Sequence, residues 1–182
     1  RRQRQMCIRD RSYVNCLKKQ NITPVHPQVG DTYILGNASF TVVCPDRYDY
    51  EEENNRSLGI RLTDSSHSFL ILGDAQSKSE SAMLNENLDL SADVYMVSHH
   101  GSASSSTEKF LRAVHPAFAV ISVGADNDYG HPAQKTLSRL EAQDIQILRT
   151  DLSGTITAYS TPDTLTLSLI HISEPTRPYW IS

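Results

Sequence analysis

Residues 68–102 decide the fold, and they read SFLILGDAQSKSESAMLNENLDLSADVYMVSHHGS. The stretch holds two apolar runs, and each is followed by groups that bind metal or transfer protons. Gly73 and Asp74 follow the first run, and the sequence His99-His100-Gly101 follows the second. A buried strand is a costly place for an unpaired carboxylate or imidazole, whereas the end of a strand can aim such a group at a ligand. Strand ends are also where layered α/β folds build their sites.

Outward from this stretch, apolar runs of strand type alternate with segments of helical periodicity. Strands are expected at residues 58–62, 68–72, 93–97, 118–123, 145–148 and 155–159. Helices are expected at residues 75–84, 108–114 and 133–142. Upstream, the sequence predicts the end of a helix at residues 12–20, with Tyr13, Val14 and Leu17 on its inner face, and a hairpin at residues 32–43. This alternation indicates an α/β fold, a mixed sheet flanked by helices.

The composition narrows the possible classes of protein. A chain of 182 residues is long enough for one domain with a sizeable core. It contains neither an apolar run of membrane-spanning length nor a signal-peptide pattern. Its three cysteines form neither a CxxC site nor a disulfide framework. The net charge of −4 has the wrong sign for a surface that grips phosphates without sequence preference.

The two ends of the sequence look foreign to the rest. Back-translation of residues 1–11 resembles a transposase adapter of sequencing libraries, and residues 167–182 resemble the second adapter read outward. Natural tails are the alternative, but two matches in frame favour adapter-derived, non-native ends. Residues 12–166 are then the biological segment, and leaving out the ends makes its charge more acidic still.

Asp74 is the best single candidate for a metal ligand. A carboxylate at the end of an apolar strand, next to a glycine that permits close approach, suits a ligand shared by two cations. Aspartate is also a preferred helix N-cap, and a helix is expected to follow. From the residue alone, the two interpretations stay open.

The histidines offer further ligands and proton carriers. Neutral imidazole binds zinc, manganese or iron. In an extended chain adjacent side chains point to opposite faces, so only one of His99 and His100 should reach a metal, and His100 is favoured because Gly101 lets the chain turn there. The alternative is a hydrogen-bonded core pair. His131 could donate a proton over the same cleft or be a plain loop histidine, and Asp151 could occupy a turn or reach the site.

Five segments carry a resemblance to a known family: NNRSLGIRL, FLILGDA, ADVYMVSHHGSASSS, AVISVGADNDYGHP and RTDLSGTI. In order and spacing they resemble the metallo-β-lactamase-fold domain of ComEC-type competence proteins and their stand-alone relatives. The resemblance implies an αββα sandwich with two divalent cations, zinc or manganese, and hydrolysis by a metal-activated water. It also implies that Asp74 bridges the cations, that His100 or His99 completes one metal site, and that His99 and His131 act in catalysis.

One motif of that family is missing. None of the seven histidines has the spacing of the first metal motif, HxHxDH. We expect that motif upstream of residue 12, which would make residues 12–166 the C-terminal part of the sandwich. Such a fragment would lack most of its metal ligands, would be inactive by itself, and would leave one face of the sheet uncovered.

Three functions remain open from the sequence. The first is a truncated metal-dependent hydrolase whose parent cleaves DNA or another phosphodiester during DNA uptake. The second is a non-catalytic module of a DNA-uptake channel, with the parent joined to a membrane channel. The third is a hydrolase of small esters or lactones with the same fold.

Overall fold

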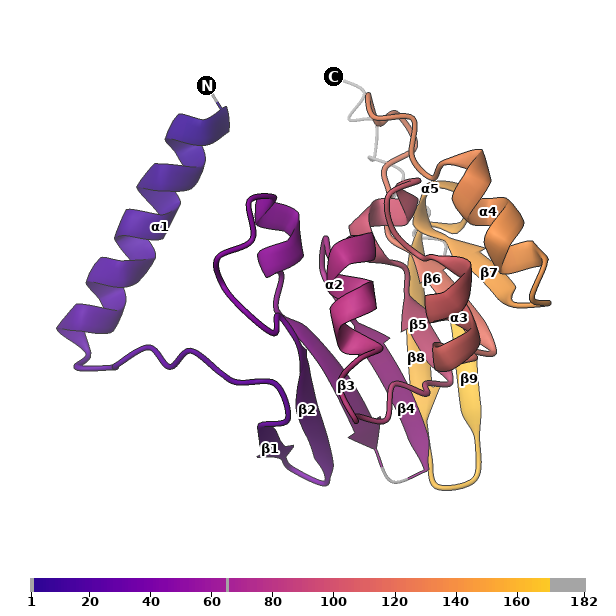
Figure 1. The fold of residues 1–182 in the computed structure, drawn as a ribbon, viewed down its shortest axis with the longest axis horizontal. Helices are drawn as coiled ribbons and strands as arrows, with labels where there is room; N and C mark the ends of the chain where they lie inside the picture. Colours follow the sequence, from indigo (N-terminus) through magenta and orange to yellow (C-terminus); the bar gives the residue numbers. More distant parts are fainter. Residues whose placement is uncertain (1, 65, 171–182) are drawn as a thin grey trace, which may run out of the picture.

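The computed structural model describes residues 2–64 and 66–170, and its centre is a mixed sheet (Figure 1). Within the described residues the sheet has seven strands, which lie side by side in chain order. These are β1 (Thr32–Leu35), β2 (Ala38–Cys44), β3 (Gly59–Asp64), β4 (His67–Ile71), β5 (Val94–Met96), β6 (Phe118–Ile121) and β7 (Gln146–Arg149). Strands β1 to β4 are antiparallel and β4 to β7 are parallel. The predicted α/β class and the mixed sheet are confirmed.

Each parallel connection contains one helix. These helices are α2 (Ser77–Met83), α3 (Glu108–Val114) and α4 (Gln134–Glu141). Because the strands advance in one direction and such crossovers are right-handed, the helices cover the same face of the sheet (Figure 1). The core lies beneath them and includes Leu70, Tyr95, Phe110, Ile121 and Leu140.

A hairpin lies behind the opposite face of the sheet. Strands β8 (Thr155–Ser160) and β9 (Leu165–Ile170) pair with each other and lie behind β5 (Figure 1). Leu167 and Ile156 of the hairpin line a cavity of about 110 Å³ together with Phe69 of the sheet. Met96 on the same face keeps 40% of its surface exposed. The hairpin therefore covers this face only in part, and the αββα sandwich stays a prediction.

The first helix, α1 (Arg2–Lys19), stands apart from the sheet (Figure 1). The predicted helix is confirmed, but its expected inner face is wrong, since Tyr13 is 66% exposed and Val14 is 43% exposed. A helix buries such a face only where another element packs on it. Of the two ends predicted to be non-native, residue 1 and residues 171–182 lie outside the described part, and the assignment stays a prediction. No helix in the described part is long and apolar enough to cross a membrane.

Candidate functional site

Asp74 lies on the turn that follows β4. Gly73 has a positive φ of 57°, which reverses the chain, and the Asp74 N–H donates a hydrogen bond to Ser57 Oγ at 3.2 Å. Helix α2 has Gln76 as its N-cap, so the interpretation of Asp74 as the helix cap is wrong. The Asp74 side chain is 45% exposed, and its Oδ1 lies 3.6 Å from His100 Nε2.

The two adjacent histidines follow β5 on the 3₁₀ turn η2 (Ser98–Gly101). Both have left-handed backbone conformations, with φ of 51° at His99 and 53° at His100. Non-glycine residues rarely adopt this conformation, so the surrounding structure must hold it in place. The chain is therefore not extended here, and the argument from alternating faces does not apply. The His99 N–H donates to Gly73 O at 3.0 Å and joins the turns after β4 and β5.

The imidazole of His100 is oriented by the next strand. Its Nδ1 lies 2.7 Å from the carbonyl oxygen of Ser122, which can only accept a hydrogen bond. Nδ1 therefore carries the proton, and in the neutral ring Nε2 keeps the lone pair that faces Asp74. Histidines that bind metals commonly donate their second N–H to a carbonyl in this way.

His99 and His131 form the second half of the cluster. Their rings meet edge to face with centroids 5.7 Å apart. Side-chain amides approach both nitrogens of His99, Gln76 Nε2 at 3.3 Å from Nδ1 and Asn54 Nδ2 at 3.5 Å from Nε2. Since these contacts are polar and His99 is only partly buried, the interpretation as a hydrogen-bonded core pair does not hold.

His131 is a partly buried member of this cluster, not an isolated loop residue. Its Nδ1 is buried and has no hydrogen-bond partner in the described structure. Burial lowers the pKa of His131, nearby His99 and His100 lower it further, and Asp74 opposes the effect. The side chain is therefore neutral at neutral pH. The four predicted site residues thus gather at one end of the sheet.

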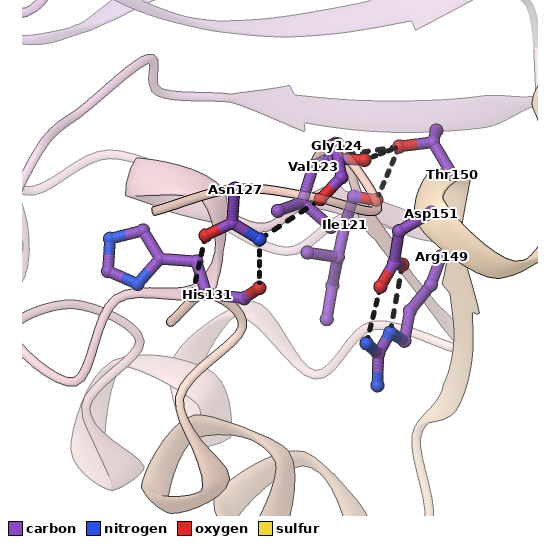
Figure 2. A network of polar contacts seen from close by, with 8 residues as sticks. All are labelled: Ile121, Val123, Gly124, Asn127, His131, Arg149, Thr150 and Asp151. Atoms are coloured by element: carbon purple, nitrogen blue, oxygen red, sulfur yellow. Dashed lines mark hydrogen bonds and ion pairs between the residues drawn. The ribbon is translucent and has the colours of Figure 1, made fainter. Parts of the chain in front are cut away.

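Asp151 belongs to another contact. Its carboxylate accepts hydrogen bonds from Arg149 Nε at 3.0 Å and Nη2 at 2.5 Å, as Figure 2 shows. These bonds lower the pKa of Asp151. The interpretation of Asp151 as a turn residue fits the structure, which places it at the start of α5 (Thr150–Ser153).

The donor types in the cluster suit a divalent cation, but their number does not. Among the described residues no group of three or more His, Cys, Asp or Glu side chains could hold a metal ion. Structural zinc sites use four protein ligands and catalytic ones use three. Asp74 and His100 supply two donors at most, so this part of the chain does not complete a metal site by itself.

A buried polar network beneath the histidine turn was missed by the sequence analysis. The Glu80 carboxylate is fully buried and accepts hydrogen bonds from the backbone N–H groups of Ser106 and Thr107. Burial raises its pKa, while these bonds and the charge of Arg139 act in the opposite direction. Arg139 also donates to Ser105 O at 2.9 Å. The only sequence signal was the run of serines and a threonine at residues 104–107, whose side chains suit the N-cap of the helix expected at residues 108–114.

A second set of contacts ties this turn to the next loop. Thr136 Oγ1 donates to Ser102 O at 2.8 Å, and the Ala133 N–H donates to Gly101 O at 2.9 Å. Gly101 has φ of 80°, and a Cβ there would lie 2.7 Å from Pro132 Cβ. The close approach of the two loops therefore requires glycine at this position.

Next to the histidines lies a pocket of about 310 Å³. His100 of η2 and Thr150, directly after β7, line it together with residues of the loop between β6 and α4. The loop residues are Ser122, Val123, Gly124, Asn127, Tyr129 and His131. Two predicted site residues, His100 and His131, form part of its wall. The pocket therefore opens beside the Asp74–His100 pair.

Comparison with known proteins identifies relatives of the chain. It is 32% identical over 148 residues to ComE operon protein 3 of Bacillus subtilis, covering 81% of the chain and 19% of the relative. It is 35% identical over 118 residues to competence protein ComA of Neisseria gonorrhoeae, and the match covers 64% of the chain and 17% of the relative. It is 31% identical over 117 residues to recombination protein 2 of Haemophilus influenzae, and the match covers 64% of the chain and 15% of the relative. No family model matches the chain. Its homologues are thus competence and recombination proteins, and it spans less than a fifth of their length.

Proposed function

We propose that this chain is part of a metal-dependent hydrolase that cleaves phosphodiester bonds during DNA uptake. In this proposal Asp74 and His100 are two ligands of a centre for zinc or manganese. The remaining ligands come from a part of the protein outside this chain. His99 and His131 lie beside the ligands and contact the substrate or carry a proton.

The observation that supports this proposal most directly is the geometry of His100. Its Nδ1–H donates to Ser122 O at 2.7 Å, and its Nε2 lies 3.6 Å from Asp74 Oδ1. A carboxylate and an imidazole nitrogen that face one another can share a cation, because the cation takes the place of the proton on that nitrogen. Both side chains are about half exposed, so a ligand from another segment has room to approach.

The class of substrate is taken from the relatives. ComE operon protein 3 and ComA are competence proteins by name, which favours DNA as the substrate. The acidic composition of the chain gives no separate support for DNA.

The test is hydrolysis of single-stranded DNA by the full-length protein that carries this sequence, with Mn²⁺ or Zn²⁺. Asp74→Asn and His100→Gln should each lower kcat/KM at least about a hundredfold, as loss of ligands and their partners does in metal sites. Asp151→Asn is the matched control, because that carboxylate is held by Arg149. Mn²⁺ binding, followed by electron paramagnetic resonance, should weaken in the first two variants only.

Two results would contradict the proposal, and each would favour one of the two alternative functions. Absence of both metal binding and hydrolysis would favour a non-catalytic module of an uptake protein. Cleavage of a lactone but not of DNA, still dependent on Asp74, would favour a hydrolase of small esters.

A further inference from the structure

We propose that the pocket beside His100 binds one unpaired nucleobase of single-stranded nucleic acid, stacked on Tyr129. This inference rests on the proposed function, because it assigns the base next to the phosphodiester bond that the centre would cleave. It goes further by naming a recognition site that selects single strands and does not distinguish the bases.

The size and place of the pocket suit such a ligand. Its volume is about 310 Å³, at the lower end of the range for small-molecule sites. His100 forms one wall, and on its other side His100 faces Asp74. A base in the pocket would therefore place its own sugar and phosphate next to the Asp74–His100 pair.

Two aromatic rings, those of Tyr129 and His131, also line the pocket. The Tyr129 ring lies nearly parallel to the His131 ring, with an angle of 21° between the planes and centroids 6.0 Å apart. Tyr129 is 69% exposed, so a ligand in the pocket can reach its ring. Exposed aromatic rings beside a groove are the platforms on which proteins stack unpaired bases.

Two polar side chains of the pocket, Asn127 and Thr150, are engaged in holding its shape. Asn127 donates to Gly124 O at 3.0 Å and to His131 O at 2.7 Å, and its Oδ1 accepts from the His131 N–H at 2.9 Å (Figure 2). The Thr150 hydroxyl accepts from the Val123 N–H and donates to Val123 O, each at 2.8 Å. Since these groups are already paired, they are poorly placed to read the edge of a particular base. Stacking accepts every base, so recognition should be independent of sequence.

The charges around the pocket point to the base rather than the phosphate. No lysine or arginine is among its lining residues, and nearby Arg149 is engaged by Asp151. The exposed acids Asp126 and Asp128 lie on the same loop. Affinity that comes from neutralising phosphates falls steeply with salt. Binding in this pocket should therefore depend weakly on salt and strongly on the presence of a base.

Single strands are favoured by the same geometry. In a duplex the faces of each base are covered by its neighbours, so a base reaches an aromatic wall only after it leaves the stack. Unstacking has a free-energy cost that a single-stranded substrate largely avoids. A duplex should consequently bind more weakly than the single strand of equal length.

The test is binding of a fluorescein-labelled dT oligonucleotide to the whole chain without metal, followed by fluorescence anisotropy. Tyr129→Ala should weaken binding about 5- to 100-fold, the loss expected for one stacked base. Tyr129→Phe should bind within about twofold of the unchanged chain, because phenylalanine keeps the aromatic face. Tyr159→Ala is the matched control, since Tyr159 is a tyrosine of similar exposure, 56%, on β8.

Three ligands complete the experiment. An abasic oligonucleotide of equal length should bind at least about fivefold more weakly, as should the duplex. Free dTMP tests whether the pocket serves a mononucleotide instead, and binding as tight as that of the oligonucleotide would overturn the assignment to a polymer. Equal binding by Tyr129→Ala or by the abasic strand would overturn the base site itself.

The outcome is separable from that of the proposed function, because this binding is measured without metal. If the protein with metal does not hydrolyse DNA but its binding of the oligonucleotide depends on Tyr129, the base site is supported and the hydrolase proposal is wrong. If the Tyr129→Ala variant hydrolyses DNA with an unchanged KM, the hydrolase proposal is supported and the base site is wrong.

Discussion

Residues 98–107, which carry His99 and His100, lie on a buried polar network, whereas none of residues 122–132, which carry Tyr129 and His131, is buried. The first loop is held from beneath by the Glu80 carboxylate. The second loop is held by hydrogen bonds from the side chain of its own Asn127 and from Thr150, which directly follows β7.

The difference fits the two tasks that we propose for this end of the sheet. Two consecutive left-handed histidines are strained, and fixed hydrogen-bond acceptors and donors beneath them keep that strain in place. A ligand for a metal benefits from such rigidity. A surface loop opens locally at little cost, which suits a wall that must admit a base. Four substitutions test this contrast, in order of expected effect.

Glu80→Ala should have the largest effect on stability. It leaves the buried N–H groups of Ser106 and Thr107 without an acceptor, which should cost about 2–5 kcal/mol of the free energy of unfolding. Urea denaturation measures the loss, and Glu141→Ala on the exposed side of α4 serves as the control. A loss below about 1 kcal/mol would mean that the network does not hold the histidine loop.

Tyr95→Phe should have the second largest effect on stability. The hydroxyl of Tyr95 is buried, accepts from the Ser98 N–H at 3.1 Å and contacts Ser106 Oγ at 3.1 Å. Its pKa is raised to about 12 by burial, so it stays neutral and available as an acceptor at ordinary pH. Its removal should cost about 1–3 kcal/mol in the same denaturation experiment. It should also raise amide exchange at residues 98–101, and unchanged exchange there would argue against a role in fixing the turn.

Asn127→Ala should change global stability by only about 0.5–1.5 kcal/mol, because its bonds to the second loop are partly exposed. Local opening should respond much more, with amide exchange at residues 127–131 faster by about tenfold or more. Hydrogen exchange followed by mass spectrometry compares the two loops in one sample. An equal rise in exchange at residues 98–101 would show that the opening is not confined to the second loop.

Asp151→Asn should have the smallest effect, about 0.5 kcal/mol near pH 7, because asparagine keeps an acceptor oxygen for Arg149, whose side chain is 25% exposed. Hydrogen bonds from Arg149 lower the pKa of Asp151. The contribution is therefore present above the ordinary aspartate pKa of about 3.9 and is lost as the pH falls through the lower folded value. Urea midpoints of the two proteins should differ near pH 7 and converge below about pH 3. A constant difference would show that the effect is not electrostatic.

Much of the fold followed from local pattern. Helix α3 occupies the predicted residues 108–114, and α2 and α4 lie within one or two residues of expectation. Periodicity of 3.6 or 2 residues reports which side of an element is buried, and each element of the parallel half packs on the shared core. The same rule failed for α1, where Tyr13 and Val14 are 66% and 43% exposed.

The candidate site could be predicted from the sequence only in part. Asp74 and His100 were predicted to share a site because each follows an apolar run at the end of an expected strand. The structure adds that β4 and β5 are parallel, so their ends lie at the same edge of the sheet. The positive φ of both histidines could not be read from sequence spacing, since it depends on hydrogen bonds from distant segments. Glu80 gave no signal, because a glutamate on a short helix is usually exposed.

The sequence by itself determined the mixed α/β sheet, the order of its elements, and the placement of a carboxylate and two imidazoles after neighbouring strands. These depend on burial along each element, which is a local property of the chain. Only the tertiary structure decided that His100 turns its Nε2 toward Asp74, that Tyr129 stacks on His131, and that a buried carboxylate supports the histidine turn. Those arrangements depend on contacts between residues far apart in the chain, and loops take their conformation from such contacts rather than from their own pattern.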